Sequence, residues 1–176
     1  MTDLIDLMRS RRSVRQYTEE KISDEQIKKI LSAALLAPSG HSKYPCEFIV
    51  VKNSETLEKL SHCRAANVAK MLNKAAAAIV VIADKEKSDT VVEDSSVAMM
   101  NMELMAASLE IGNCWIQVRA RDAENNSPAE EYLRGILKFP ENFMCQAVLA
   151  LGIAAKQPRA RELEKLNFSK VHDETF

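Results

Sequence analysis

The sequence predicts an α+β domain with a mixed, mainly antiparallel sheet flanked by helices, and three observations support this class. Apolar residues recur at helical spacing in residues 24–35 and 91–111. Short apolar runs typical of strands lie between and after these helices, without the regular alternation of a doubly wound fold. A polar tail follows the last of these runs. The 176 residues suit one domain, which we place at residues 1–155, with an arm at residues 156–176.

Capping signals locate the helices of the N-terminal part. Thr2 is a suitable cap for a first helix that runs to about Arg11. Ser23 and Gln26 have the spacing of a capping box, and a helical apolar stripe follows them until Pro38 interrupts the pattern. Two helices are therefore expected before the first strand.

The next part of the chain carries both strand and helix signals. The apolar runs at residues 47–52 and 77–83 predict strands, and the second run is apolar on both faces, as in a buried strand. Ser54 is expected to cap a helix that runs to about Cys63, and a further helical segment is expected over residues 65–73. Helical segments should therefore separate these two strands.

The strongest helix prediction covers residues 91–111, where two apolar stripes lie side by side. Between Ser96 and Ile111 the only charged residues are Glu103 and Glu110, seven positions apart, which predicts one narrow solvent-exposed face. Such a helix should be buried nearly all round. The pattern leaves open whether an ordinary core or a subunit interface covers it.

The last third of the domain predicts two strands around a helix. Gly112 is expected to end the preceding helix, and residues 114–119 and 147–154 read as strands, with a helix between them at residues 128–137. The tail has only a weak strand signal, at residues 168–172. A tail of this length with little apolar content must pack on something else or be disordered.

Charge and cysteine content exclude several classes of protein. With 24 basic and 25 acidic residues, a net charge of −1 argues against a dedicated nucleic-acid binder. The longest apolar run, residues 75–83, is too short to cross a membrane, and no signal-peptide pattern is present. Four scattered cysteines argue against a disulfide framework or a metal site and favour a cytoplasmic protein; they are Cys46, Cys63, Cys114 and Cys145.

The most informative run is R-R-S-V-R at residues 11–15. Arg presents planar, permanently charged forks that match phosphate oxygens, and Ser adds a short hydrogen-bond donor. Placed so close together, these groups are suited to hold one phosphate monoester and a further anionic atom of the same ligand. The alternative is a solvated basic turn, because short basic runs are common.

No catalytic side chain can be assigned from the sequence. Four glycines leave little room for a nucleotide-binding loop, and neither G-x-G-x-x-G nor a Walker motif is present. The three histidines lie in different segments, and helix starts explain the paired carboxylates at residues 93–94 and 130–131. Side chains suited to bind a phosphate, without a catalytic side chain beside them, fit a site where a bound cofactor performs the reaction.

The order of several motifs resembles that of a known family. R-R-S-V-R is followed by A-P-S-G-H-S, then by G-N-C-W-I-Q after the long helix, and finally by A-V-L-A-L-G-I and P-R-A-R. This order is similar to that of the short members of the FMN-dependent nitroreductase family. The resemblance implies an α+β homodimer with two FMN molecules in its interface. It also implies that each C-terminal arm adds a strand to the sheet of the partner.

The resemblance assigns flavin-binding roles to two groups of residues in this chain. The first group matches the family's first flavin motif, whose cations share the phosphate, ribityl chain and pyrimidine edge; it comprises Arg11, Arg12, Ser13 and Arg15. Ile116 and Gln117 match the backbone segment that faces the reactive side of the ring.

Two further pairs match more weakly. Asn67 and Lys70 match an N-x-x-K element near the pyrimidine edge in longer members, with an exposed helix face as the alternative. Arg159 and Arg161 match tail cations that close over the phosphate, with a solvated tail as the alternative.

One loop departs from the family pattern. Pro38, Ser39 and Gly40 match the loop that packs on the flavin from the other subunit. The family then usually shows Asn, Gln and Pro-Trp, whereas this chain has Ser42, Tyr44 and Pro45-Cys46 at residues 42–46. Two amide side chains and an aromatic ring are thereby lost from the loop.

The resemblance implies an NAD(P)H-dependent FMN oxidoreductase with ping-pong kinetics. NADH or NADPH would deliver a hydride to the flavin N5 and leave, and an acceptor such as a nitroaromatic, a quinone or a free flavin would take its place. The altered loop leaves a second interpretation open, a flavin- or nucleotide-binding carrier or sensor without turnover. No metal, nucleic acid or membrane is expected to bind.

Overall fold

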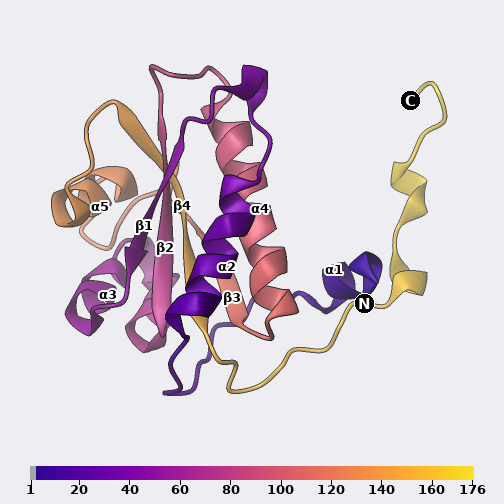
Figure 1. Ribbon diagram of the computed structural model, residues 1–176, viewed down its shortest axis with the longest axis horizontal. Helices are drawn as coiled ribbons and strands as arrows, with labels where there is room; N and C mark the ends of the chain where they lie inside the picture. The colour runs from indigo at the N-terminus through magenta and orange to yellow at the C-terminus, as the bar shows by residue number, and fades with distance from the viewer. Residues whose placement is uncertain (1–2) are drawn as a thin grey trace.

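The computed structural model describes residues 3–176 (Figure 1). Thr2, predicted to cap the first helix, lies outside the described residues. Helix α1 (Leu4–Ser10) follows Asp3, whose side chain accepts a hydrogen bond from the backbone N–H of Ile5 at 3.2 Å. Within residues 3–176 no helix is long and apolar enough to cross a membrane.

The centre of the fold is a four-stranded sheet with strand order β1-β2-β4-β3. The strands are β1 (Cys46–Val51), β2 (Ala77–Asp84), β3 (Gly112–Gln117) and β4 (Phe143–Gly152). Each neighbouring pair is antiparallel, and a parallel contact is added where Ser13 bridges Asn113 at the β3 edge. This confirms the predicted α+β class, with antiparallel pairing throughout the named strands.

Helices cover both faces of the sheet (Figure 1). Helices α2 (Asp24–Leu35) and α4 (Val91–Ser108) pack on one face, in a core that includes Ile30 and Met102. Helices α3 (Ser54–Leu60) and α5 (Ala129–Leu137) pack on the other. All ten residues of β4 are buried, as a strand covered on both faces requires.

Local signals located several boundaries correctly. The capping box of α2 is formed. The Ser23 hydroxyl accepts a hydrogen bond from the backbone N–H of Gln26, and the Gln26 side-chain oxygen accepts one from the backbone N–H of Ser23. Helix α5 begins after Pro128, as predicted. The cap of α3 is Asn53 rather than Ser54, because the Asn53 side chain accepts from the N–H of Thr56 at 2.9 Å.

Left-handed residues explain two boundaries that sequence analysis placed wrongly. Instead of one helix over residues 65–73, the chain forms two short 3₁₀ helices, Ala65–Asn67 and Lys70–Lys74, because Ala66 and Asn67 have φ angles of 55° and 59°. Glu110, with a φ of 58°, ends the turn after α4. Gly112, predicted to end this helix, is instead the first residue of β3.

In the single chain, helix α4 is covered on the sheet side but not all round, so the ordinary core that the sequence allowed accounts for only part of its cover. Val97 and Met100 are 40% and 37% exposed. On α2, which packs beside α4, Leu35 is 69% exposed and the neighbouring Leu36 is 81% exposed. These apolar side chains form an uncovered surface of the single chain.

The tail after β4 leaves the body of the protein and runs beside α1 (Figure 1). The strand expected at residues 168–172 is absent from the single chain, where Phe168–Lys170 is a 3₁₀ helix. Phe168 and Val171 are 72% and 66% exposed, and Met8 of α1 is 44% exposed. Exposed apolar side chains on an extended segment indicate a surface that packs on another molecule.

Candidate active site

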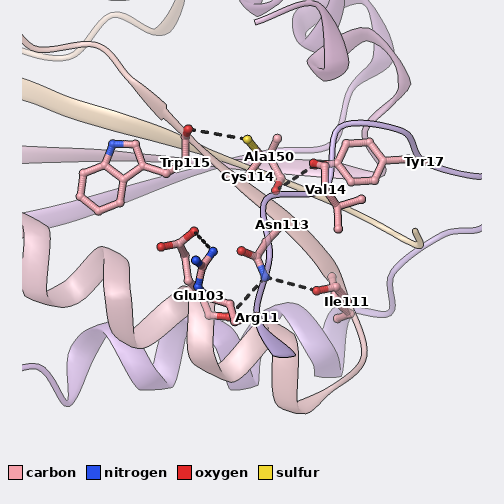
Figure 2. Close-up of polar contacts among 9 residues, drawn as sticks. All are labelled: Arg11, Val14, Tyr17, Glu103, Ile111, Asn113, Cys114, Trp115 and Ala150. Carbon is pink, nitrogen blue, oxygen red and sulfur yellow. Dashed lines mark hydrogen bonds and ion pairs between the residues drawn. The ribbon is translucent and has the colours of Figure 1, made fainter. Parts of the chain in front are cut away.

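The R-R-S-V-R segment lies along the β3 edge of the sheet (Figure 2). The backbone N–H of Val14 donates to the carbonyl of Asn113 at 2.8 Å, and Ser13 bridges the same residue. Val14 is buried whereas Arg15 is exposed, as expected for neighbouring positions of an extended segment. Gly112 permits this approach, because a Cβ atom there would lie 3.0 Å from Cγ1 of Val14.

Arg11 contacts a buried carboxylate. Its Nη1 lies 3.4 Å from Oε1 of Glu103 on α4, and the two side chains are 19% and 7% exposed. The prediction of a solvent-exposed Glu103 is therefore wrong. Burial raises the pKa of Glu103 above its usual value, and the Arg11 guanidinium opposes this shift. The charge of Arg11 is thus partly balanced within the chain.

Arg12 ties the tail to the end of α1. Its guanidinium donates to the carbonyl of Arg159. The Arg159 side chain pairs with Glu162 at 2.7 Å and is 84% exposed, while the backbone N–H of Arg161 donates to the carbonyl of Arg9 at 2.9 Å. Both predicted tail cations therefore lie near α1, with exposed side chains in the single chain.

An open recess of about 310 Å³ lies next to Ser13 and Arg15. Lys156 also lines it, because the backbone N–H of Ala155 donates to the carbonyl of Gln16 at 3.0 Å and so holds the tail beside the R-R-S-V-R segment. Sequence analysis missed Lys156, for which its place in the basic tail was the available signal. A hydroxyl and two exposed cations around one recess can bind a phosphate.

The end of β3 is fixed by hydrogen bonds to Gln117. Its side-chain oxygen accepts from the indole N–H of Trp115 at 2.9 Å, and its backbone carbonyl accepts from the guanidinium of Arg64. Ile116 is buried beside it, at 2% exposure. Arg64, which sequence analysis missed, keeps a buried Nε without a partner among residues 3–176. It therefore retains hydrogen-bonding capacity at this end of β3.

Asn67 and Lys70 follow Arg64 in the two short 3₁₀ helices. Asn67 is exposed, and Lys70 is half-buried. A hydrogen bond from His62 lowers the pKa of the exposed Glu124, and Lys70 adds to this shift. The charge of Lys70 therefore acts partly on Glu124. Arg64 supplies the hydrogen bond that joins this segment to β3.

The loop after α2 is bound to the first turn of α4. The Asp94 carboxylate accepts from the hydroxyl of Ser39 at 3.0 Å and from the backbone N–H of Gly40 at 2.9 Å. Pro38 is exposed beside them. Sequence analysis explained Asp94 by its place at a helix start, but the side chain is buried at 6% exposure and holds the loop. Asp94 thus supports the candidate site, a role that sequence analysis missed.

A second recess, of about 180 Å³, lies under this loop. Tyr44, Cys46 and Phe48 line it together with apolar residues of α2. Cys46 stands where the family resemblance has a Trp, so the smaller side chain contributes to the space. Burial raises the pKa of the Cys46 thiol, which leaves it in the less reactive protonated form.

Helix α4 separates the loop from the R-R-S-V-R segment within one subunit. The loop contacts Asp94 and Arg11 contacts Glu103, nine residues further along the helix. Nine residues correspond to about 13 Å along the axis and about two and a half turns, so the two contacts lie on opposite sides of the helix. The structure therefore does not bring Ser39 and Arg11 together in one subunit.

Other potential catalytic groups do not gather in the described residues. His62 lies between Glu124 and Glu58, at 2.6 Å and 3.5 Å, while His41 and His172 are exposed. Residues 3–176 contain no group of three His, Cys, Asp or Glu residues suited to a metal. This region therefore offers binding groups rather than a nucleophile with its base.

Known proteins share this sequence and fold. The sequence matches the Nitroreductase family over residues 8–66 and 61–153. It is 38% identical, over the full length of both proteins, to an Archaeoglobus fulgidus protein provisionally named an NADH dehydrogenase/NAD(P)H nitroreductase. A similarly named protein of Methanothermobacter thermautotrophicus is 34% identical over 92% of this chain and 82% of its own.

A solved structure agrees with these matches. An FMN-dependent nitroreductase from Clostridium difficile superposes with a TM-score of 0.95 at 40% identity, covering 98% of this chain and 99% of that chain. Family match, full-length identity and superposition agree with one another and with the α+β fold described above. The chain belongs to the nitroreductase family.

Proposed function

We propose that this chain is an NAD(P)H-dependent FMN oxidoreductase that works as a homodimer in the cytoplasm. The observation that carries the proposal is the recess formed by Ser13, Arg15 and Lys156 at the β3 edge, where two exposed cations and a hydroxyl meet. The names of the relatives support the identity of the ligand, because one is FMN-dependent and others are named for NAD(P)H.

The residues present fit FMN. Its phosphate and ribityl chain require cations and hydroxyl donors, which the first flavin motif supplies; that motif comprises Arg11, Arg12, Ser13 and Arg15. Lys156 adds a cation at the same recess. The flat ring requires a rigid surface to pack on, and the backbone at Ile116 and Gln117 offers one at the end of β3. Arg64, bonded to the Gln117 carbonyl, retains a buried N–H donor there. In the dimer, the tail cations Arg159 and Arg161 close over the phosphate.

When bound, FMN supplies the redox chemistry, taking a hydride at N5 from NADH or NADPH and giving it to a nitroaromatic, a quinone or a free flavin. The chain's own residues bind and orient the reactants. Lys70, with Asn67 in the neighbouring 3₁₀ helix, would stabilise the negative charge that reduction places on the pyrimidine edge. In a partly buried site, each charge-assisted contact contributes about 1.5 to 3 kcal/mol.

The same geometry supports a dimer. Because α4 separates the loop at Pro38 from the R-R-S-V-R segment, one subunit does not offer both parts to one ligand. A second copy brings its loop to the flavin of the first. The exposed apolar side chains of α4, such as Val97, are then covered. The arm at residues 156–176 of one subunit packs on the domain at residues 1–155 of the other.

A non-catalytic flavin carrier or sensor is the second candidate function. The altered loop favours it, because Ser42, Tyr44 and Cys46 replace the residues usual in the family. Four free cysteines, three of them buried, support the cytoplasmic location in either case.

Steady-state kinetics separate the two functions. Initial rates are measured with NADH or NADPH against menadione as the quinone acceptor, at several fixed concentrations of each. The oxidoreductase gives parallel double-reciprocal lines, because the nicotinamide leaves before the acceptor binds. Intersecting lines refute the ping-pong order, and a flavin-loaded protein without turnover refutes the enzyme.

A further inference from the structure

The carboxylate of Asp94 accepts three hydrogen bonds, two of them from the loop after α2 and one from Thr90 at the start of α4. Oδ1 accepts from the backbone N–H of Gly40 at 2.9 Å. Oδ2 accepts from the hydroxyls of Ser39 at 3.0 Å and Thr90 at 3.2 Å. Asp94 is only 6% exposed. A buried carboxylate with this many donors fixes its partners strongly, because each bond has a charged acceptor shielded from water.

The loop needs such an anchor because its backbone is strained. His41, Ser42 and Tyr44 have φ angles of 51°, 55° and 46°, in the region that side chains disfavour. Gly40 fits closely against α4, since a Cβ atom there would lie 2.3 Å from Oγ1 of Thr90. A strained turn persists only when surrounding contacts fix it, and Asp94 provides these contacts.

We infer that Asp94 is a positioning residue that acts in trans: it holds the Pro38–Gly40 turn against the flavin of the partner subunit. The inference rests on the proposed function, which places this turn at the second subunit's cofactor. The two contacts on opposite sides of α4 support action in trans, since Arg11 of the same chain lies on the far side of the helix.

Asp94→Asn isolates the anchor with little change in shape. The amide keeps one oxygen for Gly40 but loses the second acceptor, which Ser39 and Thr90 share. FMN affinity, measured by quenching of flavin fluorescence, is expected to fall by about tenfold, because the released turn must be ordered again when the flavin binds. Unchanged affinity in the purified dimer would overturn the inference.

A heterodimer distinguishes a positioning role from a general loss of stability. Subunits carrying Asp94→Asn and Arg15→Ala are co-expressed with different tags, and the mixed dimer is purified over both tags. If Asp94 acts in trans, one site of this dimer carries both defects and the other carries none. Half of the sites should then bind FMN with wild-type affinity, although neither parent homodimer does.

Action in cis gives the opposite result, because each site of the mixed dimer then carries one defect. A mixed dimer without a wild-type site would overturn the inference, provided that the wild-type protein binds FMN. A wild-type protein that binds no FMN would refute the proposed function and the inference together. The two failures are therefore distinguishable.

Two further variants complete the design. Glu130→Gln is the matched control, since the Glu130 carboxylate accepts from the N–H of Cys145 at 2.8 Å on the opposite face of the sheet. It should lower the melting temperature and leave FMN affinity unchanged. If Asp94→Asn does not fold, Thr90→Val replaces it, because it removes one donor to the Asp94 carboxylate and leaves the residues of the flavin-binding loop unchanged. The same complementation is expected, and its absence overturns the inference.

Discussion

The guanidinium of Arg11 lies 3.4 Å from the carboxylate of Glu103, and the two groups are separated by 92 positions in the sequence (Figure 2). The pair joins the R-R-S-V-R segment to α4. Burial raises the pKa of Glu103 and Arg11 lowers it, with burial the larger effect. Ionised Glu103 is therefore less favourable in the folded protein than in the unfolded chain.

This shift predicts a pH dependence of stability. Because the folded pKa of Glu103 lies above the ordinary value of 4.5, its protonated form contributes stability that is complete below about pH 4.5 and is lost as the pH rises through the folded pKa. In Glu103→Gln this loss should disappear. Urea unfolding between pH 4 and 8, at fixed protein concentration, measures it.

The matched control for this measurement is Glu110→Gln, on an exposed residue just beyond the same helix. Its pH profile should follow the wild type. If the Glu103→Gln profile also followed the wild type, the buried pair would have no effect on proton binding, and this prediction would fail.

Arg15→Ala should weaken FMN binding with little effect on the fold, because Arg15 is exposed and lines the proposed phosphate recess. Loss of one charged hydrogen bond costs about 1.5 to 3 kcal/mol, or roughly ten- to a hundredfold in affinity. Fluorescence quenching during titration of the apoprotein measures this change.

Arg11→Ala should weaken FMN binding as well, but it should also lower the melting temperature, because it leaves the buried Glu103 without its cation. Riboflavin, which lacks the phosphate, is the control ligand. Equal FMN affinity in the wild type and both variants would refute the assignment of this motif.

The protein should be an obligate dimer. Val97, Met100 and Leu36 are exposed apolar residues on the helical face of the single chain, and covering them favours association. Sedimentation at low micromolar concentration is expected to show no monomer that retains flavin. A stable yellow monomer would contradict this prediction.

Truncation after Ala155 should weaken both dimerisation and flavin binding. It removes Lys156 from the recess, and it removes Phe168 and Val171, whose exposed side chains we expect to pack on the partner. Gel filtration and FMN titration measure the two losses separately. A truncated dimer that binds FMN like the full chain would show that the tail has no role.

Replacing only the two tail arginines separates charge from packing. In Arg159→Gln/Arg161→Gln the dimer should persist while FMN affinity falls, because the backbone N–H of Arg161 still contacts Arg9 and the apolar side chains remain. Unchanged affinity would leave Lys156 as the cation supplied by the tail.

The parts of the fold that the sequence predicted well depend on local signals. Ser23 and Gln26 form the capping box that their spacing indicated, because both groups lie within one helical turn. The strand at residues 77–83 is β2, buried on both faces, as its continuous apolar run required. Neither result depends on distant parts of the chain.

The parts that sequence analysis missed depend on contacts between distant segments. The sequence predicts one solvent-exposed face for Glu103 and Glu110, but Glu110 lies beyond the end of α4 and Arg11 approaches Glu103 from the N-terminal segment. Asp94 likewise meets Ser39, 55 positions away. The residues alone indicated the R-R-S-V-R motif and the family resemblance gave it a flavin role, whereas Asp94, Lys156 and the charge balance of Arg11 required the tertiary structure.

Anaerobic reduction of the purified dimer tests the central claim most directly. We predict that the protein, yellow as purified or after addition of FMN, loses its flavin absorbance on addition of about one equivalent of NADH or NADPH per subunit, since one hydride reduces one flavin. Bleaching by either nucleotide would confirm hydride transfer within the dimer. A yellow protein that keeps its absorbance with both nucleotides would contradict the enzyme assignment, and a colourless protein that binds no FMN would contradict the flavin site itself.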